Sequence, residues 1–312
     1  MLLTAIYVQL AVLAFALLWF GFSHRRSLRD LIFKSSVIII LLLGLSLGSV
    51  WVYPPFWGLG VLAFIFVLLL VWKLRKEPIS TKSWRGWTSN IPAILLIPLG
   101  TFIGVQGFLG GNQSPKGPTT DLISPFKETG KACVLSGGLN SFVNQHNFES
   151  SSPGDYGQRF GLDFMGSEKY GFRTSAGYTL NPKPTNFKAY VIFGAPLVAP
   201  CDGKVVWAET NKPEQEIGSS DKNWTSGNGV TLACGGVHVK LSHMQKDSVL
   251  VTEGEFVSAG QEIGRVGNSG NTEEPHLHLH AETIVEPDNP WVHGEPVHMK
   301  IMGKFLSRGD CL

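Results

Sequence analysis

Residues 274–282 read EPHLHLHAE and place a histidine at every second position, namely His276, His278 and His280. Side chains of a β-strand point alternately to the two faces of the sheet. As a strand, this segment would put all three imidazoles on one face and the two intervening leucines in a core. A row of imidazoles on one face is able to bind a metal ion. It is equally compatible with a solvated strand face, so the segment alone predicts a strand and leaves its role open.

The strand pattern continues on both sides of this segment, from residue 131 to residue 312. Short apolar runs broken by Gly, Asn and Pro follow one another, among them GKVVWAE, GVTLACGG and HVKLSHM, and no helical period of useful length is present. This pattern predicts an all-β domain of antiparallel strands over 131–312, with a long polar loop at 210–229. Residues 111–130 are rich in Gly, Pro, Ser and Thr and are predicted to be a linker.

The first 110 residues have the composition of a membrane domain. Three runs carry no charge: Leu2–Phe22, Ser35–Trp72 and Ile91–Leu109. A helix that crosses a bilayer needs about 20 apolar residues, and the middle run is long enough for two short helices joined at VYPPFW. The first run is also compatible with a signal peptide, but it lacks a basic start and further apolar runs follow. We therefore predict an α-helical bundle of four transmembrane helices over 1–110.

Basic residues cluster in two of the three loops between the predicted helices. They are Arg25, Arg26, Arg29 and Lys34 in the first loop, and Lys73, Arg75, Lys76, Lys82 and Arg85 in the third. Short loops rich in Lys and Arg stay in the cytoplasm, so both termini are predicted to lie outside it. The lipid bilayer is the expected partner of this region, and a formal net charge of +2 is too small to indicate binding to nucleic acid.

All four cysteines follow the last apolar run. They are Cys133, Cys201, Cys234 and Cys311. An even number confined to the external part indicates two disulfides in an oxidising compartment. A metal site made of four thiolates is disfavoured because no CxxC spacing occurs. Of the three possible pairings we favour Cys201–Cys234, which would join neighbouring strands, and Cys133–Cys311, which would tie the two ends of the domain together.

Two polar residues interrupt other apolar runs of the β-domain. RFGLDF places Asp163 between Leu162 and Phe164, and VKLSHM places His243 at the end of a run. Taken alone, an isolated strand Asp commonly faces solvent, and a strand His is commonly held in structural hydrogen bonds. Each becomes informative only through the order in which it occurs with the triple-histidine segment.

That order resembles the lysostaphin-like, or LytM-type, zinc metallopeptidases of bacterial cell walls, over residues 158–285. The resemblance is carried by GLDF at 161–164, PLVAPCDGKV at 196–205, GNGV at 227–230, SHM at 242–244, GQEIG at 260–264, GNSG at 267–270 and PHLH at 275–278. It implies an antiparallel β-domain of the LytM, duplicated-hybrid-motif-like kind. It also implies a zinc-dependent endopeptidase, held here at the bacterial cytoplasmic membrane, that hydrolyses stem or cross-link peptides of peptidoglycan.

The resemblance also implies roles for individual residues. Asp163 and His278 match ligands of the single zinc ion, and His243 and His276 match the catalytic histidines. Zinc held by three protein ligands keeps a fourth position for water and lowers the pKa of that water to about 7. A neighbouring imidazole can then accept or donate the proton that peptide hydrolysis requires.

One position departs from the family pattern. The third ligand is usually a histidine four residues before the Asp, and Arg159 stands there; a guanidinium stays protonated and cannot bind zinc. We predict that His146, in SFVNQHN, supplies the ligand, with a degenerate site as the alternative. Arg159, Asn228 and His280 are predicted to contact substrate or to support the ligands.

Arg159 also keeps a second function open, that of a catalytically inactive LytM-type domain that binds and regulates cell-wall hydrolases. The presence of the other four site residues argues against it. A membrane sensor or transporter is a third class, but the apolar runs contain no internal acid, Lys or Arg that would mark a transport path. We therefore interpret the helices as an anchor.

Overall fold

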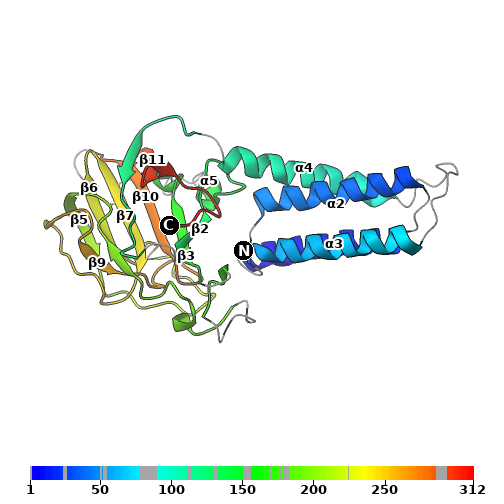
Figure 1. The fold of residues 1–312 in the computed structure, drawn as a ribbon. Helices are drawn as coiled ribbons and strands as arrows, with labels where there is room; N and C mark the ends of the chain where they lie inside the picture. The colour runs from blue at the N-terminus through cyan, green and yellow to red at the C-terminus, as the bar shows by residue number, and fades with distance from the viewer. Residues whose placement is uncertain are drawn as a thin grey trace. The chain divides into compact units, whose positions relative to one another are not determined.

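The computed structural model describes residues 2–23, 27–49, 51, 55–76, 90–111, 114–128, 132–149, 156–168, 171–175, 178, 181, 183–223, 225–285 and 294–312. The chain separates into two compact units, Met1–Leu109 and Gly110–Leu312. Each unit has a hydrophobic core made only of its own residues. Figure 1 shows helices in the first unit and mainly strands in the second, as the sequence predicted.

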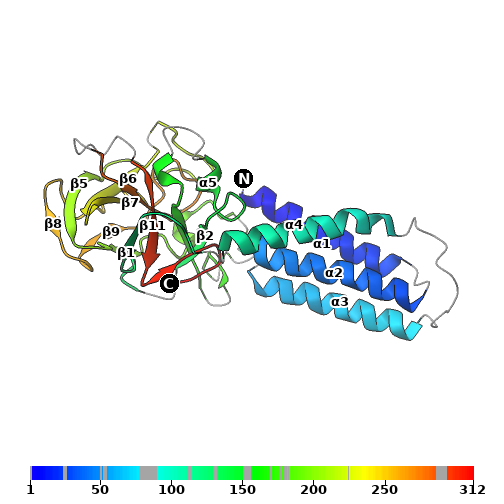
Figure 2. The ribbon, with the colours of Figure 1, turned by 90° about the horizontal axis from the view of Figure 1, so that it is seen from above.

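The N-terminal unit contains four long helices, α1 (Leu2–Phe22), α2 (Leu28–Gly48), α3 (Trp57–Lys76) and α4 (Ile91–Gly111). Each is long and apolar enough to cross a membrane, by length and composition. Figure 2 shows them running side by side. The prediction of four apolar helices is therefore confirmed. Its orientation stays a prediction, because Arg25, Arg26, Lys82 and Arg85 lie outside the described residues.

Helix α2 begins seven residues before the predicted apolar run and takes in charged positions that were assigned to a loop. Asp30 and Lys34, one turn apart, form a buried ion pair at 3.0 Å. Pairing of opposite charges at this spacing lets a helix continue through both residues. The sequence boundary was wrong because each charge was taken alone as the end of the apolar segment.

Helices α2 and α4 approach each other so closely that their backbones touch. A Cβ atom added at Gly44 would lie 2.0 Å from the carbonyl oxygen of Gly100, and one at Gly107 would lie 2.4 Å from that of Leu47. Small residues at the interface are what permits such an approach between apolar helices. Glycines of both helices are thus the residues that let α2 and α4 pack together.

The C-terminal unit is built around a ten-stranded sheet in which β1-β11-β10-β7-β6-β5-β8 are neighbours, with β2 and β3 joined to β10 and β12 to β11. The strands are β1 (Thr119–Leu122), β2 (Ala132–Ser136), β3 (Leu162–Gly166), β5 (Gly203–Glu209), β6 (Asn228–Cys234), β7 (Val237–Met244), β8 (Phe256–Val257), β10 (Leu277–Thr283), β11 (Pro296–Ile301) and β12 (Lys304–Phe305). A separate two-stranded sheet joins β4 (Pro196–Val198) to β9 (Glu262–Arg265). Three short helices lie between strands: α5 (Gln145–Glu149), η2 (Tyr156–Gln158) and η5 (Phe187–Ala189).

Strand β10 is the predicted strand of the triple-histidine segment, and it has neighbours on both sides (Figure 1). On one side β7 pairs with it from His278 to Thr283. On the other side β3 pairs with its first half and β11 with its second half. Leu277 and Leu279 are fully buried in the core, as alternation predicted. The histidines that alternate with these leucines therefore share the opposite face of the sheet.

The predicted linker is in part an ordered piece of the β-domain, which corrects the boundary at residue 130. Strand β1 lies within it and pairs with β11 (Figure 2). Leu122 and Phe126 are buried in the core. The β1–β11 pair is parallel, whereas the other pairs of named strands are antiparallel as predicted. Sequence reasoning missed this strand because the segment is rich in Gly, Pro and Thr. Only Leu122 in the strand and Phe126 after it are apolar residues of the core.

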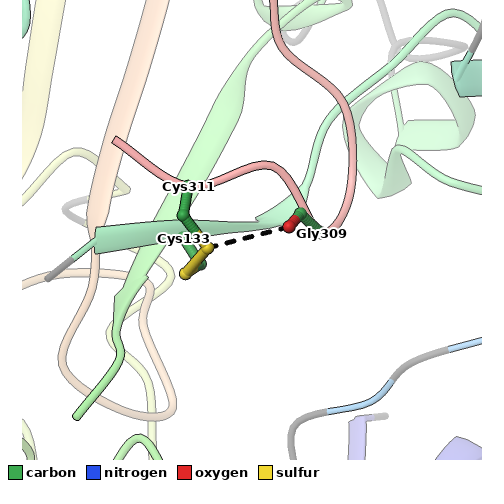
Figure 3. The surroundings of a disulfide bond; sticks show 3 residues. All are labelled: Cys133, Gly309 and Cys311. Carbon is green, nitrogen blue, oxygen red and sulfur yellow. Dashed lines mark hydrogen bonds between the residues drawn. A yellow bond between two sulfur atoms is a disulfide. The ribbon is translucent and has the colours of Figure 1, made fainter. Parts of the chain in front are cut away.

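The four cysteines form two disulfides in the arrangement that we favoured. Cys133 of β2 is bonded to Cys311 near the C-terminus, with Cα atoms 4.0 Å apart and 178 positions between them in sequence. Figure 3 shows the Sγ atom of Cys311, within this disulfide, beside the carbonyl oxygen of Gly309, at 3.7 Å. Cys201 and Cys234 join the start of β5 to the end of β6. The first disulfide ties the last residues of the chain to the sheet.

Candidate metal centre

Asp163 is carried to the centre of the site by strand pairing. On β3 it lies directly opposite His278 of β10, while its neighbours Leu162 and Phe164 point into the core. Its side chain is buried, and a buried carboxylate requires partners. Oδ1 lies 2.9 Å from Nδ1 of His278. Oδ2 lies 2.9 Å from Nε2 of His146. The carboxylate therefore lies between two imidazoles.

His146 reaches this carboxylate because a polar turn fixes the start of α5. The Oδ1 atom of the fully buried Asn144 accepts a hydrogen bond from the backbone N–H of His146, at 3.0 Å. The Nδ2 group of Asn144 donates to the carbonyl oxygens of Gly138 and Gly161. Ser136 of β2 accepts from the backbone N–H of Gln145. These bonds attach the short helix to the sheet, next to the first residues of β3.

The three side chains have the composition and spacing of a zinc site. One ligand atom from each of His146, Asp163 and His278 lies within 4.8 Å of the others, and all three residues are buried. Two imidazole nitrogens and a carboxylate oxygen form a donor set that zinc accepts, with a fourth position left for water. The residues present therefore fit the ion that the sequence predicts.

The electrostatics of the three side chains also favour a cation. Burial would raise the pKa of Asp163, but His146, His278 and His276 outweigh it and hold the pKa well below its ordinary value. Burial, followed by the proximity of His146, lowers the pKa of His278 to about 4. Asp163 is therefore ionised and His278 is neutral at pH 7, which are the forms that bind metals.

His243 and His276 flank the three side chains and form a second pair. Their ring centres are 4.6 Å apart, and the ring of His243 lies 6.0 Å from that of His278. Nε2 of His276 lies 3.8 Å from Oδ1 of Asp163. The structure thus brings all five of the predicted ligand and catalytic residues together.

Each ring of this pair is oriented by a backbone carbonyl. Nδ1 of His243 lies 2.9 Å from the carbonyl oxygen of Ser269, and Nδ1 of His276 lies 2.8 Å from that of Glu274. A carbonyl oxygen only accepts, so both Nδ1 atoms carry a proton, and in the neutral form of either ring the lone pair is on Nε2. Burial, together with His276 and His278, holds the pKa of His243 well below its ordinary value. A neutral imidazole of this kind can accept a proton from a nucleophile.

Asn228, predicted to contact substrate or to support the ligands, is held in hydrogen bonds to the backbone. It is fully buried. Its Nδ2 group donates to the carbonyl oxygens of Lys212 and Met244, at 2.9 and 3.2 Å. Its Oδ1 atom accepts from the backbone N–H of Lys212, at 2.8 Å. Asn228 therefore attaches the long loop to the end of β7, next to His243.

The backbone of His243 is strained, and Ser269 is the residue that supports it. His243 has φ of 63°, in the left-handed region that non-glycine residues rarely adopt. The Oγ atom of Ser269 accepts from the backbone N–H of Asn228 and donates to the carbonyl oxygen of Met244. Its own carbonyl oxygen accepts from the His243 ring. Sequence reasoning did not single out Ser269, although it lies in the GNSG segment.

Arg159 and His280 differ in their contacts with the three side chains. The guanidinium of Arg159 lies over the ring of Phe160, 5.7 Å from its centre, and its Nε atom is buried without a hydrogen-bond partner among the described residues. No contact among the described residues joins the Arg159 side chain to His146, Asp163 or His278. His280 is buried, and its Nδ1 atom lies 2.8 Å from Nε2 of His278. His280 therefore contacts a predicted ligand.

Two residues near the ligands were missed by sequence reasoning. Gln145 precedes His146, and its Nε2 group donates to Oδ2 of Asp163 at 3.3 Å. Gly161 lies so close to the rings that a Cβ atom there would be 2.8 Å from Cε1 of His278. Neither residue type signals a metal site by itself. Only the fold, which brings Gln145 and Gly161 close to Asp163 and His278, places them there.

Comparison with known proteins finds a family match for part of this unit. Residues 186–290 match the model of Peptidase family M23. The match includes His243, His276 and His278, whereas His146 and Asp163 precede it. No curated protein matches the chain.

Several solved structures are similar to the C-terminal unit. Lysostaphin from Staphylococcus simulans is 23% identical, with a TM-score of 0.25, over 39% of this chain and 36% of that chain. A zinc-containing peptidase from Vibrio cholerae is 19% identical, with a TM-score of 0.27, over 53% and 36%. The complex of SpoIIIAH and SpoIIQ is 15% identical, with a TM-score of 0.32, over 52% and 92%. The match thus spans about a third of the length of the first two.

Proposed function

We propose that this chain is a membrane-anchored zinc endopeptidase of peptidoglycan. The premise is the match of residues 186–290, in the C-terminal unit, to Peptidase family M23. The observation that carries the proposal is the group formed by His146, Asp163 and His278, whose ligand atoms lie within 4.8 Å of one another. The family supports hydrolysis of a peptide bond. The donor set supports zinc as the ion that assists it.

The roles of the ligands follow from their chemistry. His146 would bind through Nε2, His278 through Nδ1 and Asp163 through its carboxylate, because these are the atoms that face one another. A zinc ion held there would lower the pKa of a water molecule and polarise the carbonyl group of the scissile amide. The negative charge of Asp163 also attracts the cation and reduces its net charge.

His243 and His276 would move the protons. Each ring donates its Nδ1–H to a backbone carbonyl, so each Nε2 atom is fixed in position and has a lone pair when the ring is neutral. One Nε2 atom would accept the proton of the attacking water. The same proton, carried on an imidazolium, would pass to the nitrogen of the leaving amine. His276 is the more accessible of the two rings, which suits it to contact with substrate.

Two features of the chain support a location for the proposed enzyme. Four helices of sufficient length and apolar character support anchoring in a bilayer. Two disulfides in the catalytic unit support an oxidising compartment, outside the cytoplasm. Peptidoglycan lies in that compartment in bacteria. We propose that the helices hold the peptidase at the outer face of the cytoplasmic membrane, within reach of stem or cross-link peptides.

One observation favours a second candidate, a catalytically inactive domain that regulates other hydrolases. Arg159 stands where the family usually has a ligand, and its side chain has no contact with the site among the described residues. The position of His146 compensates for this change. We therefore favour the enzyme, and an activity assay separates the two candidates.

The test uses the full-length chain in detergent with purified peptidoglycan. Release of new primary amines is measured by dinitrophenyl labelling, on peptidoglycans with direct and with glycine cross-links. We expect amine release that stops on chelation, returns with zinc and is absent in His276→Ala. Zinc-loaded wild type that releases no amine from either substrate would contradict the enzyme and support the regulatory domain.

A further inference from the structure

His280 is buried beside the ring of His278 and contacts it. Nδ1 of His280 lies 2.8 Å from Nε2 of His278, and both side chains are buried. The contact is on the side of the His278 ring opposite to Asp163, which approaches Nδ1. The group of side chains able to hold a metal contains His278 and not His280. His280 is therefore a partner of the ligand rather than a ligand.

The contact constrains where the protons of both rings lie. Without a metal, the ionised Asp163 accepts a hydrogen bond from Nδ1–H of His278. Nε2 of His278 then has the lone pair and must accept from Nδ1–H of His280. With a cation on Nδ1 of His278, the proton of that ring must be on Nε2, and His280 must accept it at Nδ1. The two arrangements contain the same number of protons.

An imidazole suits this position because its Nδ1 atom can either donate or accept a hydrogen bond. A carboxylate at position 280 would only accept, and a lysine would only donate. The partner of a metal-bound histidine is usually a carboxylate, a carbonyl or a water molecule. Here Glu282, the acid two residues further along the same face, is already paired with Lys240 and accepts from the backbone N–H of Gly294.

We infer that His280 is a positioning residue that holds His278 in place and exchanges hydrogen-bond roles with it when the metal binds. On binding, the proton of His278 moves from Nδ1 to Nε2, and that of His280 moves from Nδ1 to Nε2 in turn. No side chain needs to rotate, and the pair neither gains nor loses a proton. This inference rests on the proposed zinc site, and its effect is on metal affinity rather than on the chemical step.

The first test is a zinc titration of the full-length chain in detergent, in competition with a chromophoric chelator. His280→Leu removes the hydrogen bond at similar volume. His280→Asn restores it, because the Oδ1 and Nδ2 atoms of an Asn stand as close to Cβ as Nδ1 of a His does, and the amide is able to accept or donate. We expect zinc affinity to fall roughly 10- to 100-fold in His280→Leu and to change only a few-fold in His280→Asn. The control is His298→Leu, another buried histidine, which should bind zinc as wild type does.

The second test reads the protons directly. In wild type labelled with ¹⁵N-histidine, His278 should show a protonated Nδ1 without zinc and a protonated Nε2 with zinc. Wild-type affinity in His280→Leu, or equal loss in the Leu and Asn variants, would overturn the inference. If wild type binds no zinc, the proposed function fails, but the metal-free spectrum still tests the His278–His280 bond. A His278 ring protonated at Nε2 in that spectrum would overturn the inference by itself.

Discussion

Nε2 of His146 lies 2.9 Å from Oδ2 of Asp163, although the two residues are 17 positions apart and belong to α5 and β3. The family pattern places a ligand four residues before the Asp, within one local segment. In this chain an imidazole reaches the carboxylate from further upstream. The contact is the structural basis for assigning three protein ligands to the proposed zinc site.

Substitution of His243 or His276 by Ala should abolish hydrolysis without removing zinc. Neither ring is among the three side chains able to hold the metal, and loss of a general acid or base lowers the rate by roughly 10²- to 10⁴-fold. The measurement pairs the rate of amine release with metal analysis of each variant. A variant that loses its zinc together with its activity would identify that histidine as a ligand.

The metal-free C-terminal unit should lose stability as the pH falls from 7 to 4.5. The folded-state pKa values of His278 (about 4) and His243 lie below the unfolded value of about 6.5. The unfolded state therefore binds more protons in this window, so the stability contributed by the neutral rings is lost on acidification. The shift of His278 alone corresponds to about 3 kcal/mol. Asp163, whose pKa is depressed, adds a further loss only below pH 4.

Urea unfolding of residues 110–312 in the presence of a chelator measures this dependence. That unit has a core made of its own residues. In His278→Leu the slope of stability against pH between 7 and 4.5 should decrease. Equal stability of the wild-type unit at pH 7 and pH 4.5 would show that these rings are not buried in their neutral form.

Asn228→Ala should destabilise the C-terminal unit. It should also lower the rate of the proposed hydrolysis, because Asn228 holds the backbone of Met244, next to His243. The change leaves buried backbone groups of Lys212 and Met244 without their partner, at a cost of roughly 1–3 kcal/mol. Asn223→Ala, at an exposed position of the same loop, is the matched control and should stay within about 0.5 kcal/mol of wild type. Equal stability of the Asn228→Ala and Asn223→Ala variants would contradict the role of Asn228 in attaching the long loop to β7.

Gly161→Ala should weaken zinc binding. The added Cβ atom would lie 2.8 Å from Cε1 of His278 and 2.9 Å from the carbonyl oxygen of Gln158. The ring has to move, because the backbone beside it is held by the amide of Asn144. Chelator competition should give a zinc affinity below that of wild type, and a melting curve reports any accompanying loss of fold. Unchanged affinity would show that the ring adapts without leaving its position.

Sequence reasoning identified the features that follow from local pattern. Alternation in EPHLHLHAE predicted the strand, its buried leucines and its row of histidines, and charge-free apolar runs predicted the four helices. Sequence reasoning was less informative where contacts between residues distant in sequence determine the position of a side chain or strand. The five-residue α5 has no periodicity, so only the fold shows that His146 reaches Asp163. Burial of Asn228 and the pairing of β1 with β11 depend in the same way on partners that are distant in sequence.

The central claim is that His146 completes a zinc site with Asp163 and His278. Metal analysis of the full-length chain by plasma mass spectrometry, after purification in detergent and treatment with a chelating resin, tests it directly. The account predicts one zinc ion per wild-type chain, the same content in His298→Ala, and loss of zinc in His146→Ala. Full zinc content in His146→Ala, or a wild-type chain without zinc after zinc has been supplied, would contradict it.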